Sequence, residues 1–325
     1  REDVGGGLTA VSLTAQLLGR GVLTGLVRRL PPAVVAPIRQ TGGRPNSVRG
    51  LLLRWLGRGL RRGGIPRFVR TFTLVDNPAV SFVNADSLVL HQLYWWGERG
   101  WEPELVPWWR HFCQRSSTIV EIGANVGYYT VLGAKAAPHA RYICVEPHPF
   151  SADLCRTHVA LNVIDSVQVI EAAAVSDATA SSIELVIPWE QLGSPAVAFL
   201  TAGSELPRRM ADRPTTSITV PTIDVGSLLD VVDLLKIDAE GQEHALLLGA
   251  WPQLLLHRPT IFVEVLSGTP KLRDLLVRLC AELGYRCYAA HSGRLVRLAT
   301  ERIPVVRLRE EFGTNDVILT TVTDL

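Results

Sequence analysis

The sequence has little lysine, no closely spaced cysteines and little net charge. Lysine occurs at only three positions, Lys135, Lys236 and Lys271, and the formal net charge is +2. The chain as a whole therefore lacks the basic excess that attracts proteins to nucleic acid. Its five cysteines are scattered without a close pair, which argues against a disulfide framework or a zinc site and predicts free thiols in a reducing compartment.

Long apolar segments are also lacking. The best candidate, LTAVSLTAQLLGRGVLTGLV near the N-terminus, is interrupted by Gln16, Arg20 and several glycines and threonines. A transmembrane helix needs about 20 predominantly apolar residues. Acidic residues precede this stretch, whereas a secretion signal begins with basic ones. We therefore expect a cytoplasmic protein without a transmembrane segment.

Residues 1–85 differ in composition from the rest of the chain. Short helical patterns alternate with prolines and glycines, and seven arginines lie between Arg49 and Arg70. Within this stretch four apolar residues can share one helical face with arginines opposite: Leu51, Leu52, Trp55 and Leu60. Such a helix can contact an anionic membrane surface or an acidic partner, but packing on the main domain is the simpler interpretation. We expect a helical, Arg-rich N-terminal extension.

Residues 86–325 carry a regular α/β pattern. From about residue 117, five strongly apolar strand-like runs alternate with helix-like runs, and two further strand-like runs, YRCYAA and NDVILTTV, follow. Alternation of this kind predicts a mostly parallel, Rossmann-like sheet with helices on both faces. The last two runs predict an antiparallel pair at the edge, which makes seven strands. We interpret residues 183–223 as a hairpin-like insertion with a mobile tip.

A glycine-rich turn follows the first of these strands. The segment EIGANVG has the spacing E-x-G-x-N-x-G, with Asn125 where a dinucleotide-binding turn has its second glycine. Gly123 and Gly127 carry no Cβ that would block a ligand from the backbone. The asparagine fits poorly with a pyrophosphate. It suits the amino-acid end of S-adenosylmethionine, whose ammonium needs acceptors and whose carboxylate needs donors.

Carboxylates follow the second and fourth predicted strands. Glu146 ends the second strand, where it can accept hydrogen bonds from ribose hydroxyls, although simple helix capping is an alternative. The fourth strand ends in KIDAEGQEH, which supplies Asp238, Glu240, Glu243 and His244. These side chains can stabilise a sulfonium or deprotonate an acceptor, whereas the interpretation without function is a favourable charge at a helix N-terminus.

Glu264 lies in the fifth predicted strand among apolar residues, where a carboxylate needs a partner. A pairing with Lys236 and a role in binding substrate or metal are both open interpretations.

The motifs VEIGANVGYYT, CVEPHPFSADLCRTHVALN, AAVSDATA, TVPTIDVGSLL and LLKIDAEGQEHALLLGA resemble the FkbM-type methyltransferase family, over about residues 117–265. The resemblance implies a Rossmann-like, class I S-adenosylmethionine-dependent fold. It implies that the methionine part of the cofactor contacts four residues: Glu121, Gly123, Asn125 and Gly127. It also implies that Glu146 holds the ribose and that Ala173, with Ser176 and Asp177 downstream, lies near the adenine. The chain departs from the family pattern at Glu121, where aspartate is usual, and at His244.

The same resemblance implies an O-methyltransferase acting on a hydroxyl of a small molecule, such as a secondary metabolite or its sugar. The candidates for catalysis are Asp238, Glu240 and His244, and Asp238 is also a candidate for cofactor binding. A magnesium ion held by Asp238 and Glu264 is an alternative for activating the acceptor, but no complete ligand set is evident in the sequence, and we expect no metal. Five tryptophans in YWWGERGWEPELVPWW either cap the site or are buried against the sheet.

Three other functions remain as alternatives. A nucleic-acid methyltransferase is disfavoured by the low net charge and by DAEG where an Asn/Asp-Pro-Pro-Tyr/Phe motif would stand. A non-catalytic scaffold with a vestigial cofactor fold is disfavoured by the intact glycine turn and Glu146. A dinucleotide oxidoreductase is disfavoured by Asn125. We expect a small hydroxylated substrate and no nucleic acid, and the sequence leaves the oligomeric state open.

Overall fold

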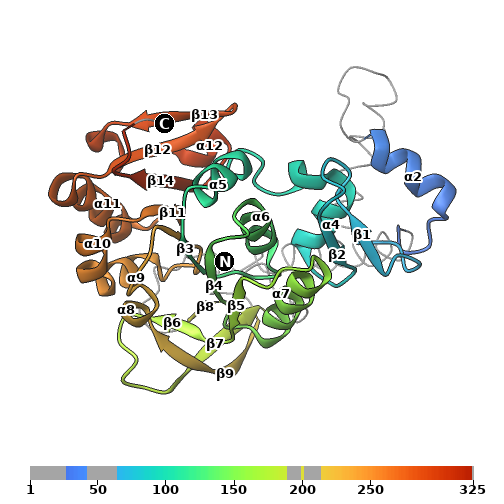
Figure 1. Ribbon diagram of the computed structural model, residues 1–325, viewed down its shortest axis with the longest axis horizontal. Coiled ribbons are helices and arrows are strands. Elements are labelled where there is room, and N and C mark those ends of the chain that lie inside the picture. The colour runs from blue at the N-terminus through green and yellow to red at the C-terminus, as the bar shows by residue number, and fades with distance from the viewer. Residues whose placement is uncertain (1–26, 42–63, 189–198, 201–213, 324–325) are drawn as a thin grey trace, which may run out of the picture. The chain divides into compact units, whose positions relative to one another are not determined.

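The computed structural model describes residues 27–41, 64–188, 199–200 and 214–323. By its internal contacts the chain divides into two units, residues 1–101 and residues 102–325 (Figure 1). Each unit is described by itself below. In the described part of the chain, none of the helices combines the length and apolar character needed to cross a membrane.

The first unit contains a β-hairpin as well as helices, so the expectation of a helical extension is incomplete. Its elements are α2 (Pro32–Thr41), β1 (Thr71–Thr73), β2 (Ser81–Val83), α4 (Leu88–Trp96) and the 3₁₀ helix η1 (Gly97–Gly100). Strands β1 and β2 pair antiparallel, and the ring of Phe72 in β1 meets Tyr94 of α4 edge to face. Arg39 of α2 donates to the Tyr94 carbonyl at 2.8 Å.

These contacts explain why the first unit ends after Trp101 rather than at residue 85. Helix α4 packs against the hairpin and α2, and therefore belongs with them. The predicted basic amphipathic helix, by contrast, falls within residues 42–63, outside the described residues.

The second unit is built around a central sheet of eight strands, mostly parallel as expected. The order across the sheet is β13-β12-β14-β11-β10-β3-β4-β5. The five strands from β11 to β5 run parallel, and β14 is antiparallel to both of its neighbours, β11 and β12. The strands are β3 (Thr118–Ile122), β4 (Arg141–Val145), β5 (Val167–Ile170), β10 (Leu234–Ile237), β11 (Thr260–Glu264), β12 (Arg286–His291), β13 (Arg294–Leu298) and β14 (Asp316–Thr320).

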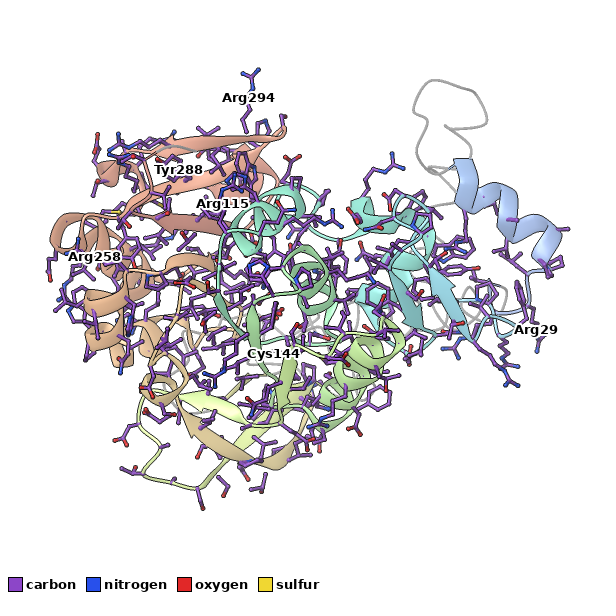
Figure 2. All side chains as sticks on the ribbon, viewed as in Figure 1. Arg29, Arg115, Cys144, Arg258, Tyr288 and Arg294 are labelled. Carbon is purple, nitrogen blue, oxygen red and sulfur yellow. The ribbon has the colours of Figure 1, made fainter. Side chains whose placement is uncertain are left out.

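The eighth strand, β13, corrects the predicted number of seven. It forms a hairpin with β12 through Ser292 and Gly293, which both adopt positive φ, 50° and 74°. Sequence analysis missed this strand because Arg294 and Arg297 make it polar. At the edge of a sheet such residues are compatible with strand pairing, since their side chains reach solvent. Figure 2 shows Arg294 pointing away from this outer edge.

Helices cover both faces of the central sheet (Figure 1). Because strand side chains alternate between faces, Val120 and Ile122 enter one core with leucines of α9 and α11. On the other face Trp109 of α5 meets the rings of Tyr129 and Phe262 edge to face. The helices of this unit are α5 (Val106–Cys113), α6 (Tyr128–Ala136), α7 (Pro149–Leu161), α8 (Val225–Leu228), α9 (Glu243–Gly249), α10 (Trp251–His257), α11 (Pro270–Leu283), η4 (Thr300–Arg302) and α12 (Leu308–Phe312).

A second, smaller sheet has the order β6-β9-β7-β8. Its strands are β6 (Ala173–Val175), β7 (Ser182–Pro188), β8 (Phe199–Leu200) and β9 (Thr215–Asp224). Strands β7 and β9 pair antiparallel, and β9 is also parallel to β6, which anchors the pair beside the central sheet. Most residues of the predicted tip, 189–198 and 201–213, lie outside the described part of the chain.

Candidate functional site

The turn between β3 and α6 consists of three residues with positive φ separated by single residues. Gly123 has φ 84°, Asn125 has φ 49° and Gly127 has φ 78°. A Cβ on Gly123 would lie 1.8 Å from the Asp238 carbonyl oxygen, and one on Gly127 would lie 2.6 Å from Cys155 Sγ. Both glycines are therefore required by close packing within the chain. This reason differs from the ligand approach that the sequence suggested.

Glu146 joins the end of β4 to this turn. Its Oε2 accepts a hydrogen bond from the Asn125 backbone N–H at 2.7 Å, and its Oε1 accepts one from the His148 N–H at 2.9 Å. The side chain is 6% exposed. Burial raises the pKa of Glu146 to about 7, although the two N–H groups favour the ionised form. Glu146 therefore fixes the conformation of the turn before any ligand binds.

Glu121 lies inside β3 and is 1% exposed. Its Oε2 accepts hydrogen bonds from the hydroxyls of Thr130, at 2.7 Å, and Tyr142, at 2.5 Å. Burial raises the pKa of Glu121 to about 7, while Lys236 and the two hydroxyls act in the opposite direction. A cofactor contact by this side chain would have to use Oε1, because protein hydroxyls already take Oε2.

The end of β10 carries a buried ion pair. Lys236 Nζ lies 3.0 Å from Asp238 Oδ2, and the Asp238 side chain is 28% exposed. The suggested pairing of Lys236 with Glu264 is wrong. In the register of β10 and β11, Lys236 stands opposite Phe262, so Glu264 lies two residues further along its strand. Asp238, two residues after the lysine and directly beyond the end of β10, reaches the ammonium instead.

Glu243 and Glu240 have different environments although only two residues separate them along the chain. Glu243 is 1% exposed, and its carboxylate accepts hydrogen bonds from the backbone N–H groups of Ala239 and Gly241 at 2.8 and 3.0 Å. These hydrogen bonds hold the turn that precedes α9, a structural role that needs no ligand. Glu240 has φ 49°, and burial, together with the charges of Asp238 and Glu243, raises its pKa well above its ordinary value.

The remaining predicted site residues lie in three places. Asp238, Glu240 and Glu264 each place one carboxylate oxygen within 4.8 Å of the others. His244 follows Glu243 in the first turn of α9 and is partly buried. Ala173 is 1% exposed and packs with Leu185 and the other apolar residues of the small sheet, so its side chain is not free to contact a ligand.

Two further carboxylates surround Lys236, and neither was identified from the sequence. Glu102 Oε2 accepts a hydrogen bond from the Tyr129 hydroxyl at 2.8 Å, and desolvation with the charge of Asp316 raises the pKa of Glu102 to about 8. Asp316 is 2% exposed, and burial raises its pKa to about 6. Burial lowers the pKa of Lys236, but these carboxylates and Asp238 raise it by more.

Comparison of the sequence with models of protein families identifies the family of this chain. The family model described as "Methyltransferase FkbM domain" matches residues 121–287, slightly more than half of the 325 residues. The chain belongs to this family. The FkbM segment begins at Glu121 and includes the glycine turn, Glu146, Asp238, Glu240 and Glu264. Glu102 and Asp316 lie outside it, which explains why motif comparison gave no signal for them.

Three solved structures that match this FkbM protein are distant from it in sequence. Methyltransferase FkbM from Methylobacillus flagellatus KT is 14% identical with a TM-score of 0.40, and the match covers 72% of this chain and 53% of that chain. The chain thus spans about half the length of that protein. An O-methyltransferase from Bacillus cereus, in complex with SAH, is 14% identical with a TM-score of 0.38 and coverages of 68% and 82%. A putative O-methyltransferase from Klebsiella pneumoniae is 16% identical with a TM-score of 0.38 and coverages of 68% and 79%. No curated protein matches the chain in sequence.

The tryptophan-rich segment before the FkbM core is at least partly structural. Trp95, in the first unit, is 1% exposed and donates to the Gly64 carbonyl at 3.0 Å. Trp109, in the second unit, is fully buried and donates to the Tyr129 carbonyl at 2.9 Å. For these two tryptophans, the interpretation of simple burial is therefore correct.

All five cysteines of the FkbM protein are free thiols, as the sequence indicated.

Proposed function

We propose that the protein is an S-adenosylmethionine-dependent methyltransferase that acts on a hydroxyl group of a small molecule. Membership of the FkbM family supports the reaction class. One observation carries the position of the cofactor: the turn after β3 touches the end of β10, where the Gly123 Cα hydrogen faces the Asp238 carbonyl. Glu146 and Asp238 also lie close enough for the charge of Asp238 to raise the pKa of Glu146.

The groups at this junction suit the parts of S-adenosylmethionine. Each oxygen of Glu146 accepts one backbone N–H, and a carboxylate has about four acceptor positions, so acceptor capacity remains for ribose hydroxyls. The N-terminus of α6 supplies backbone N–H groups for the carboxylate of the cofactor. The Asp238 carboxylate, 28% exposed, is complementary to a positively charged ammonium or sulfonium.

When bound, S-adenosylmethionine would supply an electrophilic methyl group, which passes to the acceptor oxygen as the bond from its carbon to sulfur breaks and S-adenosylhomocysteine leaves. The contribution of the chain is to position the two reactants and to remove the acceptor proton. Asp238, Glu240 and His244 are the candidates for proton removal. Because burial raises the pKa of Glu240, its ionised carboxylate is a stronger base than an ordinary glutamate.

Titration calorimetry with S-adenosylmethionine, S-adenosylhomocysteine and NADH tests the proposed cofactor. We expect saturable binding of the two sulfur compounds and none of NADH. Glu146→Gln keeps the shape of the side chain but removes the charge that ribose hydroxyls would bind. Loss of charged hydrogen bonds of this kind corresponds to at least about tenfold weaker binding. Glu184→Gln is the matched control, because Glu184 is an exposed residue of β7.

The outcomes separate the proposed functions. Binding that weakens in Glu146→Gln and stays unchanged in Glu184→Gln supports the cofactor site, and hydroxylated acceptors are then screened for methylation. If well-folded protein binds neither sulfur compound, the methyltransferase proposal fails and the scaffold alternative replaces it. Binding of NADH alone would instead indicate an oxidoreductase.

A further inference from the structure

Three carboxylates converge between the ends of β10 and β11. Asp238 directly follows β10, Glu240 lies two residues later in the turn, and Glu264 is the last residue of β11. The two strands are parallel neighbours, and Ile237 stands opposite Val263, so the next residues, Asp238 and Glu264, project from the same edge of the sheet. One oxygen from each of the three side chains lies within 4.8 Å of the others.

Glu264 contributes an oxygen atom without a partner. Its Oε1 accepts a long hydrogen bond from Asn315 Nδ2 at 3.4 Å, whereas Oε2 is buried and has no hydrogen-bond partner in the described part of the chain. Asn315 directly precedes β14, which lies on the opposite side of β11 from β10. Asn315 therefore satisfies Oε1 alone, and Oε2 stays without a donor among the described residues, in a side chain that brings one oxygen within 4.8 Å of Asp238 and Glu240. A buried carboxylate oxygen without a donor is costly, which indicates a missing positively charged or donating group.

Lys236 does not supply the missing charge. Its ammonium contacts Asp238 through Oδ2, and it is also influenced by Glu102, Asp316 and Glu121. One lysine therefore already faces four carboxylates. Because the ammonium takes Oδ2 of Asp238, Oδ1 remains for another ligand.

We propose that Asp238, Glu240 and Glu264 bind one hard divalent cation, with Ca²⁺ or Mg²⁺ as the probes. Carboxylate oxygens are the ligands that such ions prefer. Two oxygens bound to one ion lie at most twice the metal–oxygen distance apart, about 4.2 Å for Mg²⁺ and about 5 Å for Ca²⁺. The three oxygens lie within 4.8 Å of one another, so small movements of the side chains would bring all three onto one ion of either kind.

This inference adds to the proposed function, although binding of the ion does not depend on it. Three protein ligands leave coordination positions for water or for oxygens of the acceptor. A hard cation lowers the pKa of a hydroxyl bound to it. The site would thus select acceptors that present an oxygen, and it replaces the expectation of a protein without metal.

The test is calorimetric titration of the full chain, freed of metal with EDTA and dialysed, with CaCl₂ and separately with MgCl₂. We expect one saturable site for at least one of the two ions. Glu264→Gln and Glu240→Gln should each weaken binding at least tenfold, and Glu184→Gln should leave it unchanged. Glutamine keeps the size of the side chain and removes repulsion, so these variants should fold, which circular dichroism verifies.

Two results would overturn the inference. One is the lack of saturable binding of both ions by folded protein. The other is unchanged binding in Glu264→Gln and Glu240→Gln, which would place the ion elsewhere. S-adenosylmethionine is titrated in EDTA in parallel. If S-adenosylmethionine binds while the ions do not, the metal site fails and the proposed function stands. If the ions bind while S-adenosylmethionine does not, the metal site stands and the proposed function fails.

Discussion

The carboxylates at the end of β4 and those at the ends of β10 and β11 differ in how their oxygens are satisfied. At the end of β4, both oxygens of Glu146 accept backbone N–H groups. At the end of β11, Glu264 has one weak donor and one buried oxygen without a partner among the described residues. Both carboxylates follow buried parallel strands, so the strand position alone does not decide their environment.

This difference separates two uses of a buried carboxylate. A carboxylate whose oxygens are bound by the backbone stabilises the conformation of the chain, and its remaining acceptor positions are held in place for a ligand. One with an unsatisfied oxygen is costly until a ligand binds. Glu243 belongs to the first kind, and Glu264 belongs to the second. The following predictions test this distinction.

Gly123→Ala should have the largest effect, because it breaks the contact between the two regions. The new Cβ would lie 1.8 Å from the Asp238 carbonyl oxygen, and alanine is strained at φ 84°. Overpacking and a left-handed backbone together should lower the free energy of unfolding by about 3 kcal/mol or more. Urea denaturation measures this change.

Gly284→Ala is the control for Gly123→Ala. Gly284 has φ 75°, and nothing lies within 4 Å of its added Cβ. Only the backbone strain remains there, about 1 kcal/mol. Equal losses in the two variants would contradict the close contact at Gly123.

Glu121 tests whether hydrogen bonds suffice to keep a buried carboxylate favourable. Its pKa in the folded protein, about 7, exceeds the ordinary value of 4.5. The folded state therefore binds more protons than the unfolded state between these values, and the contribution of Glu121 to stability falls as the pH rises from about 4.5 to about 7. In Glu121→Gln this loss is absent, so the unfolding free energy of the variant relative to the wild type should rise by on the order of 3 kcal/mol between pH 4.5 and pH 8.

Urea denaturation of both proteins at several pH values in EDTA measures their unfolding free energies. Subtracting the wild-type value from that of the variant at each pH removes the contributions of other titrating groups. A pH-independent difference would show that the hydroxyls of Tyr142 and Thr130 offset the burial of Glu121.

Glu243→Gln and Glu240→Gln should have the smallest effects, of opposite sign. The amide introduced by Glu243→Gln lacks the charge and one of the two acceptor oxygens that the N–H groups of Ala239 and Gly241 use, which lowers stability by about 1–2 kcal/mol. Glu240→Gln removes repulsion from Asp238 and Glu243 and should leave the stability in EDTA equal or up to about 1 kcal/mol higher. Thermal denaturation at pH 8 compares the two variants, and a destabilised Glu240→Gln would contradict the repulsion of Glu240 by Asp238 and Glu243.

The sequence predicted the parallel sheet because the pattern is local to each strand. Apolar runs such as TIVEI of β3 and LLKI of β10 are buried along their whole length, and the residues after them meet at one edge. The positions of Glu146, Asp238 and Glu264 near this edge followed from that pattern. The pattern did not show why glycine is required in the turn after β3, because that depends on which chain segment packs against each glycine.

Contacts between distant segments could not be predicted. The partner of Lys236 depends on the register of β10 against β11, and of the two interpretations left open for Glu264, the pairing with Lys236 fails because the residues are displaced by two positions. Glu102 and Asp316 come from opposite ends of the second unit and meet the same lysine only in the folded chain. Strand β13 is stabilised by pairing with β12, which its polar sequence does not indicate.

Strand β13 also determines how the sheet ends. Without it, the edge of the sheet would be β12, which carries Cys287 and two alanines among its buried residues. With it, the outermost row of backbone groups belongs to a short strand that carries Arg294 and Arg297. Charged side chains on a short edge strand oppose the approach of another strand. The hairpin of β12 and β13 thus disfavours self-association and fibril growth by strand addition at this edge of the sheet.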